Sequence, residues 1–241
     1  MSASEPRGGL GSPHLHVRVL DSTNTRAREL AAAGAPHGAL VTAGEQRAGR
    51  GRQGRTWSAP PGRALLSSLV LRDPPRLLPL LAGVAVAEVA ERAGASAQVK
   101  WPNDVLVGGR KVAGILVEGR PQERWAVLGI GLNVALRRDD FPPELRDTAA
   151  TLGLEPGAVP AMLAALLEVL ERWLQRPGEA VLDAVRERDA LRGRRITWSA
   201  GEGVADGIDG DGRLVVRAGD GSRVALDAGE VHLGPRTRTD R

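Results

Sequence analysis

The sequence predicts an α+β fold followed by a small β module at the C-terminus. Strand-like and helix-like segments follow one another without the strict alternation that a doubly wound parallel sheet requires. After Gly193 the pattern changes to short apolar runs that are separated by Gly-Asp turns, as in "GIDGDGRLVV". A chain of 241 residues has room for one sizeable core and one such module.

The first third of the chain is expected to open with a disordered arm over residues 1–14. "LHVRVL" (15–20) alternates apolar and polar residues, which predicts a strand. "DSTNTRARELAAAG" begins with N-cap residues and ends at Gly34, which predicts a helix over about 23–33. Next we expect a strand over 39–46, a glycine- and arginine-rich loop over 47–62, a buried strand over 64–72 and a helix over 75–94.

The next part is expected to return to strands before two helices. "GG" at 108–109 predicts a two-residue hairpin turn. An apolar stripe at helical spacing predicts that the first of the two helices faces the core. The expected elements are strands over 97–102, 104–107, 110–120 and 124–136, helices over 159–176 and about 179–192, a small barrel over 193–235 and a loose tail over 236–241.

The composition excludes several classes of function. Cysteine is absent, so no disulfide, thiolate metal site or cysteine nucleophile is possible. The net charge is only +4 and aromatic residues make up 2% of the chain, which is weak support for nucleic-acid binding. The chain does not start like a signal peptide, and its most apolar stretch, 77–90, is too short to span a bilayer, so we expect a cytoplasmic protein without membrane contact.

Two residue types are rare enough to be informative. Of the 33 basic residues only Lys100 and Lys111 are lysines, and asparagine occurs only at positions 24, 103 and 133. A chain that uses arginine almost everywhere else retains lysine where a compact ammonium is needed. Chance or a turn requirement is the alternative explanation.

The segment "GRGRQG" (49–54) matches the glycine spacing of dinucleotide-binding loops. That function needs a helix to begin within the motif, and the prolines of the following "RTWSAPPG" prevent one. A Walker A loop fails because no Lys-Ser/Thr pair follows the glycines. What remains is a cationic, glycine-rich loop suited to close over an anionic substrate, or a plain solvated surface loop.

Together, four stretches resemble the biotin–protein ligases: "DSTNT" (21–25), "AGEQRAGRGRQGRTW" (43–57), "VKWPNDVLVGGRKVAGILVE" (99–118) and "LGIGLNVAL" (128–136). The resemblance implies a catalytic core over 15–192 like that of the class II aminoacyl-tRNA synthetases, followed by an SH3-like barrel. It implies that biotin and ATP form biotinyl-5′-adenylate, and that this acylates a lysine of a biotin carboxyl carrier protein domain. Activation needs fixed positive charge between two anions and no protein nucleophile.

The resemblance also implies the roles of individual residues. Lys111 and Arg52 are the expected catalytic residues, with Lys111 between the biotin carboxylate and the α-phosphate. The expected biotin-binding residues are Ser22, Thr23, Asn24, Gln46, Arg50, Gly51, Arg52, Lys111, Gly114 and Ile115. The expected ATP- or adenylate-binding residues are Arg52, Arg55, Trp57, Lys100, Asn103 and Asn133. Asp104 is a possible contact for Mg²⁺, or part of a structural turn.

Some alternatives remain open at this point. Some family members carry a DNA-binding helix-turn-helix domain at the N-terminus, and about fourteen residues before the first expected strand are too few for one. We therefore expect a ligase, monomeric or homodimeric, without specific DNA binding. A lipoate-type acyl ligase would share the core fold, although "GRGRQGR" and "KWPND" disfavour it. A nucleic-acid-binding module that uses the arginine-rich loop is a rival from a different class.

Overall fold

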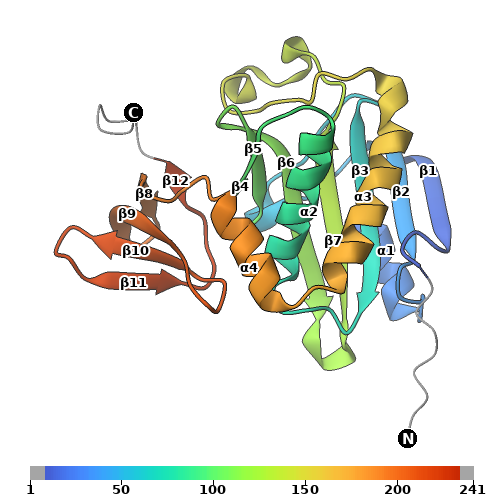
Figure 1. The fold of residues 1–241 in the computed structure, drawn as a ribbon. Helices are drawn as coiled ribbons and strands as arrows, with labels where there is room; N and C mark the ends of the chain where they lie inside the picture. The colour runs from blue at the N-terminus through green and yellow to red at the C-terminus, as the bar shows by residue number, and fades with distance from the viewer. Residues whose placement is uncertain (1–8, 234–241) are drawn as a thin grey trace, which may run out of the picture.

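The computed structural model describes residues 9–233 and has two parts, a large mixed sheet covered by helices and a separate antiparallel sheet at the C-terminal end (Figure 1). The α+β prediction is confirmed at this level. Residues 1–8 and 234–241, and with them most of the expected arm and the whole of the expected tail, lie outside the described residues.

The large sheet has seven strands in the order β1-β2-β3-β7-β6-β5-β4. Only β1 and β2 are parallel, and every other neighbouring pair is antiparallel. Its centre is the β3–β7–β6 unit, whose strands pair along most of their length. The strands are β1 (His14–Leu20), β2 (Leu40–Gln46), β3 (Ala64–Arg72), β4 (Ala97–Lys100), β5 (Asp104–Val107), β6 (Arg110–Arg120) and β7 (Trp125–Asn133).

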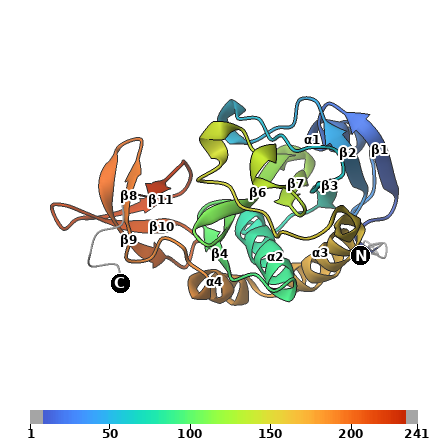
Figure 2. The same ribbon diagram turned by 90° about the horizontal axis from the view of Figure 1, so that it is seen from above.

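Helices cover both faces of this sheet (Figure 2). α1 (Thr23–Ala32) packs on one face through Ala27 and Ala31, and α2 (Leu78–Arg92) and α3 (Val159–Leu174) pack on the other. α4 (Gly178–Glu187) lies between α2 and the C-terminal sheet. As the apolar stripe predicted, α3 turns this side to the core.

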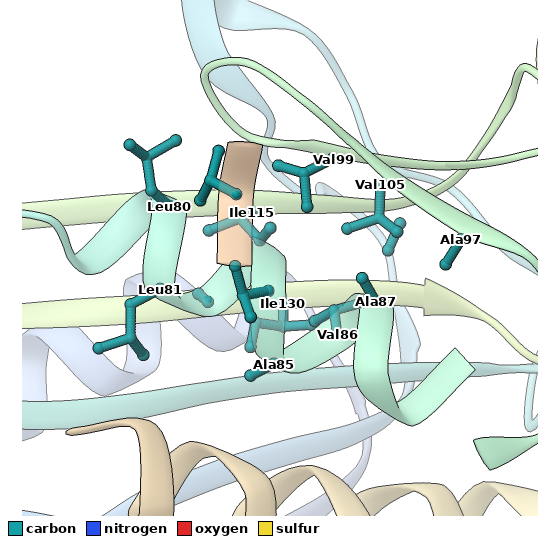
Figure 3. Close-up of a cluster of buried hydrophobic side chains, with 14 of the residues drawn as sticks. Leu80, Leu81, Ala85, Val86, Ala87, Ala97, Val99, Val105, Ile115 and Ile130 are labelled. Atoms are coloured by element: carbon teal, nitrogen blue, oxygen red, sulfur yellow. The ribbon is translucent and has the colours of Figure 1, made fainter. Parts of the chain in front are cut away.

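The main core lies between α2 and the sheet, because α2 is apolar on nearly all sides. Its small residues let the helix approach the strands closely, and a Cβ at Gly83 would lie 3.2 Å from Val99. Figure 3 shows Leu80, Ala85 and Val86 against side chains of the strands, including Ile115 of β6. Each fully buried Leu, Ile or Val contributes roughly 1.5–3 kcal/mol. This layer gives strands β4–β6 a rigid support.

The predicted hairpin turn between β5 and β6 is confirmed. Gly108 and Gly109 have φ angles of 57° and 73°, which are left-handed conformations that glycine adopts without strain. The turn places Lys111 just after the reversal, across the hairpin from Leu106, and the Lys111 side chain reaches Asp104.

Among the element boundaries that differ from the sequence-based prediction, three have a visible cause. Residues 9–13 were expected in a disordered arm, but Gly11 donates a hydrogen bond to Gly38 O, and Leu10 packs against the core. β7 ends at Asn133 rather than at 136, because the next two backbone N–H groups turn to Arg63 O. α4 ends at Glu187 rather than at about 192, because the chain after it pairs with Val99 of β4.

The C-terminal part forms a five-stranded antiparallel sheet in the order β11-β10-β9-β8-β12. The expected run of short strands with Gly-Asp turns is confirmed. β11 and β12 are the two edge strands, and within residues 9–233 they do not pair with each other, so a closed barrel is not confirmed. The strands are β8 (Arg195–Trp198), β9 (Gly201–Ile208), β10 (Leu214–Ala218), β11 (Arg223–Leu226) and β12 (His232–Leu233).

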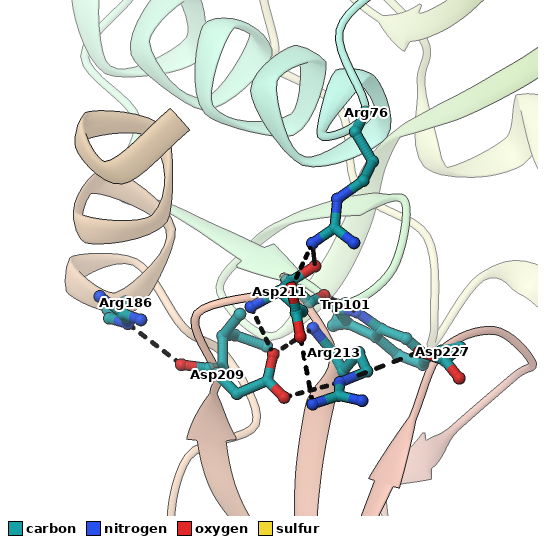
Figure 4. Close-up of polar contacts among 9 residues, drawn as sticks. Arg76, Trp101, Arg186, Asp209, Asp211, Arg213 and Asp227 are labelled. Atoms are coloured by element: carbon teal, nitrogen blue, oxygen red, sulfur yellow. Dashed lines mark hydrogen bonds and ion pairs between the residues drawn. The ribbon is translucent and has the colours of Figure 1, made fainter. Parts of the chain in front are cut away.

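The β9–β10 turn of this sheet contacts the part that holds the large sheet (Figure 4). The indole N–H of Trp101 donates to Gly212 O at 3.0 Å, and Arg76 reaches the Asp211 carboxylate at 2.8 Å. Trp101 is the neighbour of Lys100, so the C-terminal sheet contacts the motif that carries the first lysine. None of the helices within residues 9–233 is long and apolar enough to cross a membrane.

Candidate active site

The two lysines of the chain converge on one carboxylate. Lys111 Nζ lies 2.6 Å from Asp104 Oδ1, and Lys100 Nζ lies 3.9 Å from Asp104 Oδ2. The β4–β5–β6 connections create this cluster, since Lys100 pairs with Asp104 across one hairpin and Lys111 follows the next turn. Burial lowers the pKa of Lys100, and the nearby Asp104 charge opposes this shift. The side chain of Lys111 is 35% exposed, so its ammonium remains accessible to a ligand.

The backbone around Lys111 is fixed by the segment Thr148–Leu152. Lys111 N donates to Thr148 O, and Ala150 N donates to Lys111 O, both at 2.7 Å. The same segment holds Asn133, whose side-chain amide donates to Ala150 O at 2.9 Å. One loop therefore fixes the position of Lys111 on β6 relative to Asn133 on β7.

Glycines on β6 and β7 form the floor of the site. Gly114 and Gly131 face each other across the two strands, and the Trp57 ring lies on both. A Cβ at Gly131 would lie 2.5 Å from the ring, so only glycine leaves room for it. Lys111 Nζ lies 5.8 Å from the centre of that ring, within cation–π range. Within the described part of the chain, the buried indole N–H of Trp57 has no hydrogen-bond acceptor.

Beside this floor, polar side chains form a buried hydrogen-bond network. The Gln46 side-chain oxygen accepts from both the backbone N–H and the hydroxyl of Thr23, at 2.7 and 3.0 Å. The Ser68 hydroxyl lies 2.8 Å from the Thr23 hydroxyl and 2.6 Å from Asn24 Oδ1. Ser22 caps α1 by accepting from Thr25 N, as the N-cap residues at the start of this segment predicted. The structure thus brings together the expected residues Thr23, Asn24 and Gln46.

Glu118 of β6 extends this network toward the glycine- and arginine-rich loop. Its Oε2 accepts from Asn24 Nδ2 at 3.0 Å, and its Oε1 lies 3.1 Å from Arg50 and 3.4 Å from Arg28. Sequence reasoning missed Glu118 and Ser68. Two adjacent hydroxyls inside the buried strand "ALLSSLVLR" were a usable signal for Ser68, whereas nothing in "GILVEGR" distinguishes Glu118 from a surface residue.

The glycine- and arginine-rich loop folds back on itself, with Trp57 N donating to Gly49 O and Gly51 N to Arg55 O. Its tip contains a short 3₁₀ turn (Arg52–Gly54). Three of its arginines contact three different elements. Arg50 pairs with Glu118, Arg52 donates to Asn103 Oδ1 at 2.9 Å, and Arg55 pairs with Glu230 of the C-terminal part. Arg55, which was expected near a nucleotide, faces Glu230 in this structure, and sequence reasoning did not foresee Glu230.

Asn103 is occupied by contacts within the protein. Its side-chain N–H donates to Ile115 O, and its backbone O accepts from Ile115 N, both at 2.9 Å. The backbone groups of Ile115, which were expected to bind a ligand, form hydrogen bonds with Asn103 in this structure, and the Ile115 side chain packs in the core (Figure 3). The side chain of Asn133 is also directed to a loop carbonyl and is almost fully buried. One of its amide hydrogens and its carbonyl oxygen remain for other partners.

The donor set around Asp104 does not fit a metal ion bound directly by the protein. Both carboxylate oxygens face lysine ammonium groups, which would repel a cation placed between them. Within residues 9–233 no group of three or more His, Asp or Glu side chains is arranged to hold a metal. The possible Mg²⁺ contact at Asp104 is thus not supported.

Comparisons with known proteins agree with this geometry. Residues 16–134 match the Biotin/lipoate A/B protein ligase family, and residues 193–234 match the Biotin protein ligase C terminal domain. The chain is 35% identical to the bifunctional ligase/repressor BirA of Bacillus subtilis, over 97% of this chain and 79% of that protein. It is also 35% identical to the biotin–[acetyl-CoA-carboxylase] ligase of Paracoccus denitrificans, over 89% of this chain and 98% of that protein.

Solved structures show the same fold. The biotin protein ligase from Aquifex aeolicus in complex with biotin and ATP superimposes with a TM-score of 0.81 at 26% identity, over 93% of this chain and 100% of that one. The sheet, the helices on its faces and the C-terminal sheet therefore form an arrangement that is also found in a structure with both ligands bound.

Proposed function

Because the chain belongs to the biotin protein ligases, we propose that it joins biotin to ATP and then passes the biotinyl group to a lysine of a carrier protein domain. The observation that carries the proposal is the convergence of Lys111 and Lys100 on Asp104 beside Trp57, within a chain that matches this family.

In the first step an oxygen of the biotin carboxylate attacks the α-phosphorus of ATP. A P–O bond forms to biotin, the bond to the β-phosphate oxygen breaks, and pyrophosphate leaves. Both reactants are anions, so their approach is unfavourable unless positive charge lies between them. Lys111 has the accessible ammonium for this role, and Arg52 lies on the loop that would cover the product.

In the second step the amine of the acceptor lysine attacks the carbonyl carbon of the adenylate. A C–N bond forms, the bond to the AMP oxygen breaks, and AMP leaves while the amine loses its proton. The acceptor we propose is the biotin carboxyl carrier domain of a biotin-dependent carboxylase, in keeping with the named activity of the Paracoccus relative. Mg²⁺ would arrive bound to the ATP phosphates rather than to protein carboxylates.

The roles of the site residues are part of the proposal. The network of Ser22, Thr23, Asn24 and Gln46 would bind the ureido ring of biotin, with Arg50, Gly51 and Gly114 beside its chain. Trp57, Lys100, Asn103 and Asn133 would line the nucleotide side, and Arg55 would approach it only if it left Glu230. A free indole N–H on Trp57 supports a ligand acceptor at that place.

The finer points of architecture are also proposals. We divide the chain into a catalytic domain over 15–192, related to the class II aminoacyl-tRNA synthetase core, and an SH3-like domain over 193–235. The order of strands β8–β12 supports the second assignment without closing the barrel. An enzyme that consumes ATP works where ATP is supplied, so we place it in the cytoplasm.

Biotin-dependent exchange of labelled pyrophosphate into ATP tests the first step directly, and mass spectrometry of the purified protein tests for retained biotinyl-adenylate. The same assay with lipoate in place of biotin tests the lipoate-type ligase. Pyrophosphate exchange that lipoate supports and biotin does not would refute the proposal.

A nucleic-acid-binding module would instead bind DNA or RNA without ATP, and its affinity would fall steeply as the salt concentration rises. Gel filtration distinguishes monomer from homodimer.

A further inference from the structure

Glu118 joins Asn24 of the buried network to the glycine- and arginine-rich loop. One of its carboxylate oxygens accepts from the Asn24 amide, and the other contacts Arg50 of the glycine- and arginine-rich loop. Its side chain, on strand β6, is largely buried. Within residues 9–233, no other side-chain hydrogen bond or ion pair joins Asn24 directly to that loop.

The environment of Asn24 fixes which way its amide points. Its NH₂ group donates to Glu118 Oε2 at 3.0 Å and to Leu116 O at 3.4 Å, while its oxygen accepts from Ser68 at 2.6 Å. The side chain lies flat on Gly129, where a Cβ would come within 1.9 Å of Oδ1. A flipped amide would place its oxygen against the Glu118 carboxylate and the Leu116 carbonyl, so the flip is unfavourable.

This orientation determines what Asn24 can offer to a ligand. Both of its N–H groups are used within the protein, and its oxygen has one lone pair left after the bond from Ser68. A ligand group at Asn24 must therefore be a hydrogen-bond donor. A buried site that is built to accept an N–H strongly rejects an analogue that lacks it, because the acceptor is left unpaired.

We propose that Glu118 is a positioning residue that makes Asn24 a pure acceptor for a ligand N–H and anchors the loop through Arg50 over the same place. The proposal rests on the proposed function, in which this N–H belongs to the ureido ring of biotin. Glu118 acts through Asn24 and Arg50 and does not itself contact the reacting atoms. Selection of the ureido ring of biotin and closure of the glycine- and arginine-rich loop therefore both depend on the Glu118 carboxylate.

Two substitutions of Glu118 change both of its contacts to different degrees, and Arg50→Gln removes only the contact with the loop. Glu118→Gln removes the charge that holds Arg50 but can rotate to donate to a flipped Asn24, whereas Glu118→Leu removes every polar partner. The substrates are biotin and a biotin analogue methylated on the ureido nitrogen, and the readout is kcat and KM in pyrophosphate exchange. Glu29→Gln is the matched control, because Glu29 lies on α1 like Asn24 but pairs only with exposed Arg26.

We expect Glu118→Gln to lower the preference for biotin over the methylated analogue about tenfold, with kcat for biotin within about twofold of wild type. Glu118→Leu should raise the KM for biotin further. In a double-mutant cycle, the variant with both Arg50→Gln and Glu118→Gln should lose no more of the preference for biotin than the more strongly affected single variant loses. An unchanged preference in a folded Glu118→Gln variant, with Glu29→Gln normal, would overturn the proposal.

A second measurement does not depend on turnover. NMR of the Asn24 side-chain amide should show slow hydrogen exchange in the wild type and fast exchange in Glu118→Leu, and equal rates would also overturn the proposal. Absence of biotin-dependent exchange in the wild type would instead refute the proposed function. The two failures are therefore distinguishable.

Discussion

The lysine cluster and the glycine- and arginine-rich loop both carry positive charge, but they hold it in opposite ways. Lys100 and Lys111 share Asp104 with side-chain exposures of 21%, 35% and 15%, and all three residues come from consecutive short strands. Arg50 and Arg55 are 45% and 57% exposed and reach partners on distant parts of the chain. The lysine charge is fixed by local hairpins, whereas the arginine charge lies on a loop with separate contacts to distant residues.

The first test of this difference is Lys111→Arg, for which we expect the largest effect. A planar guanidinium is too large to take the place of the ammonium between Asp104 and Trp57. We expect biotin-dependent pyrophosphate exchange to fall at least about 100-fold, comparable to the loss of a key electrostatic group. The melting temperature should stay near that of the wild type. Pyrophosphate exchange at the wild-type rate would show that any positive charge at position 111 is sufficient.

Gly131→Ala tests the glycine floor that supports the fixed cluster. The new methyl group would lie 2.5 Å from the Trp57 ring and must displace the ring. A displaced ring would also lose its contact with the Lys111 ammonium. We expect the KM for ATP to rise about tenfold, consistent with the loss of one good aromatic contact. Gly210→Ala is the matched control, since no atom lies within 4 Å of its added Cβ. An unchanged KM for ATP in Gly131→Ala would show that Trp57 does not contribute to nucleotide binding.

Arg52→Gln tests the loop, where we expect a smaller loss. Glutamine can still donate to Asn103, so the loop should keep its place while it loses one charge. We expect biotinyl-adenylate to dissociate about three- to tenfold faster, since a partly exposed cation contributes modestly. Release can be followed by stopped-flow fluorescence, with Arg47→Gln as the control. A fall in pyrophosphate exchange as large as that of Lys111→Arg would contradict the division between fixed and closing charge.

Glu88 pairs with Arg92 and Arg172 away from the site, and it shows how fixed arginine charge stabilises the fold. Although burial opposes it, hydrogen bonds from Arg172, Trp173 and Arg92 lower the pKa of Glu88 to about 2. The stabilisation is therefore present above the unfolded pKa near 4.5 and is lost as pH falls toward 2. Glu88→Gln should lower the melting temperature at pH 7 by about 2–4 °C. The difference from wild type should vanish near the lower pH, and a constant difference would refute the linkage.

Local patterns were sufficient to predict most of the fold. Alternation, capping residues and the Gly-Gly turn located the strands, helices and hairpin, because each depends on neighbours in sequence. The ends of β7 and α4 were misplaced because they are set by distant partners, Arg63 and Val99, that no local pattern reveals. Closure of the C-terminal sheet could not be read from its turns for the same reason.

The site shows the same limit. Rarity singled out both lysines and all three asparagines, and the structure brings the lysines together at Asp104. Glu118 and Glu230 were missed because their partners lie far away in sequence and their own surroundings are ordinary. Asn133 and Ile115 were expected to face a ligand, yet hydrogen bonds from a loop and from Asn103 already occupy them in part.

The pairing of the only two lysines with Asp104 affects how readily the enzyme acylates its own side chains. An acyl-adenylate that escapes is an indiscriminate acylating agent for free primary amines, and the nearest protein is the one that made it. This chain presents few such targets, because arginine, which carries almost all its other basic charge, is not acylated in this way. Lys100 is buried and Lys111 is held by an ion pair, so we expect the enzyme to label itself far less than a lysine-rich bystander does.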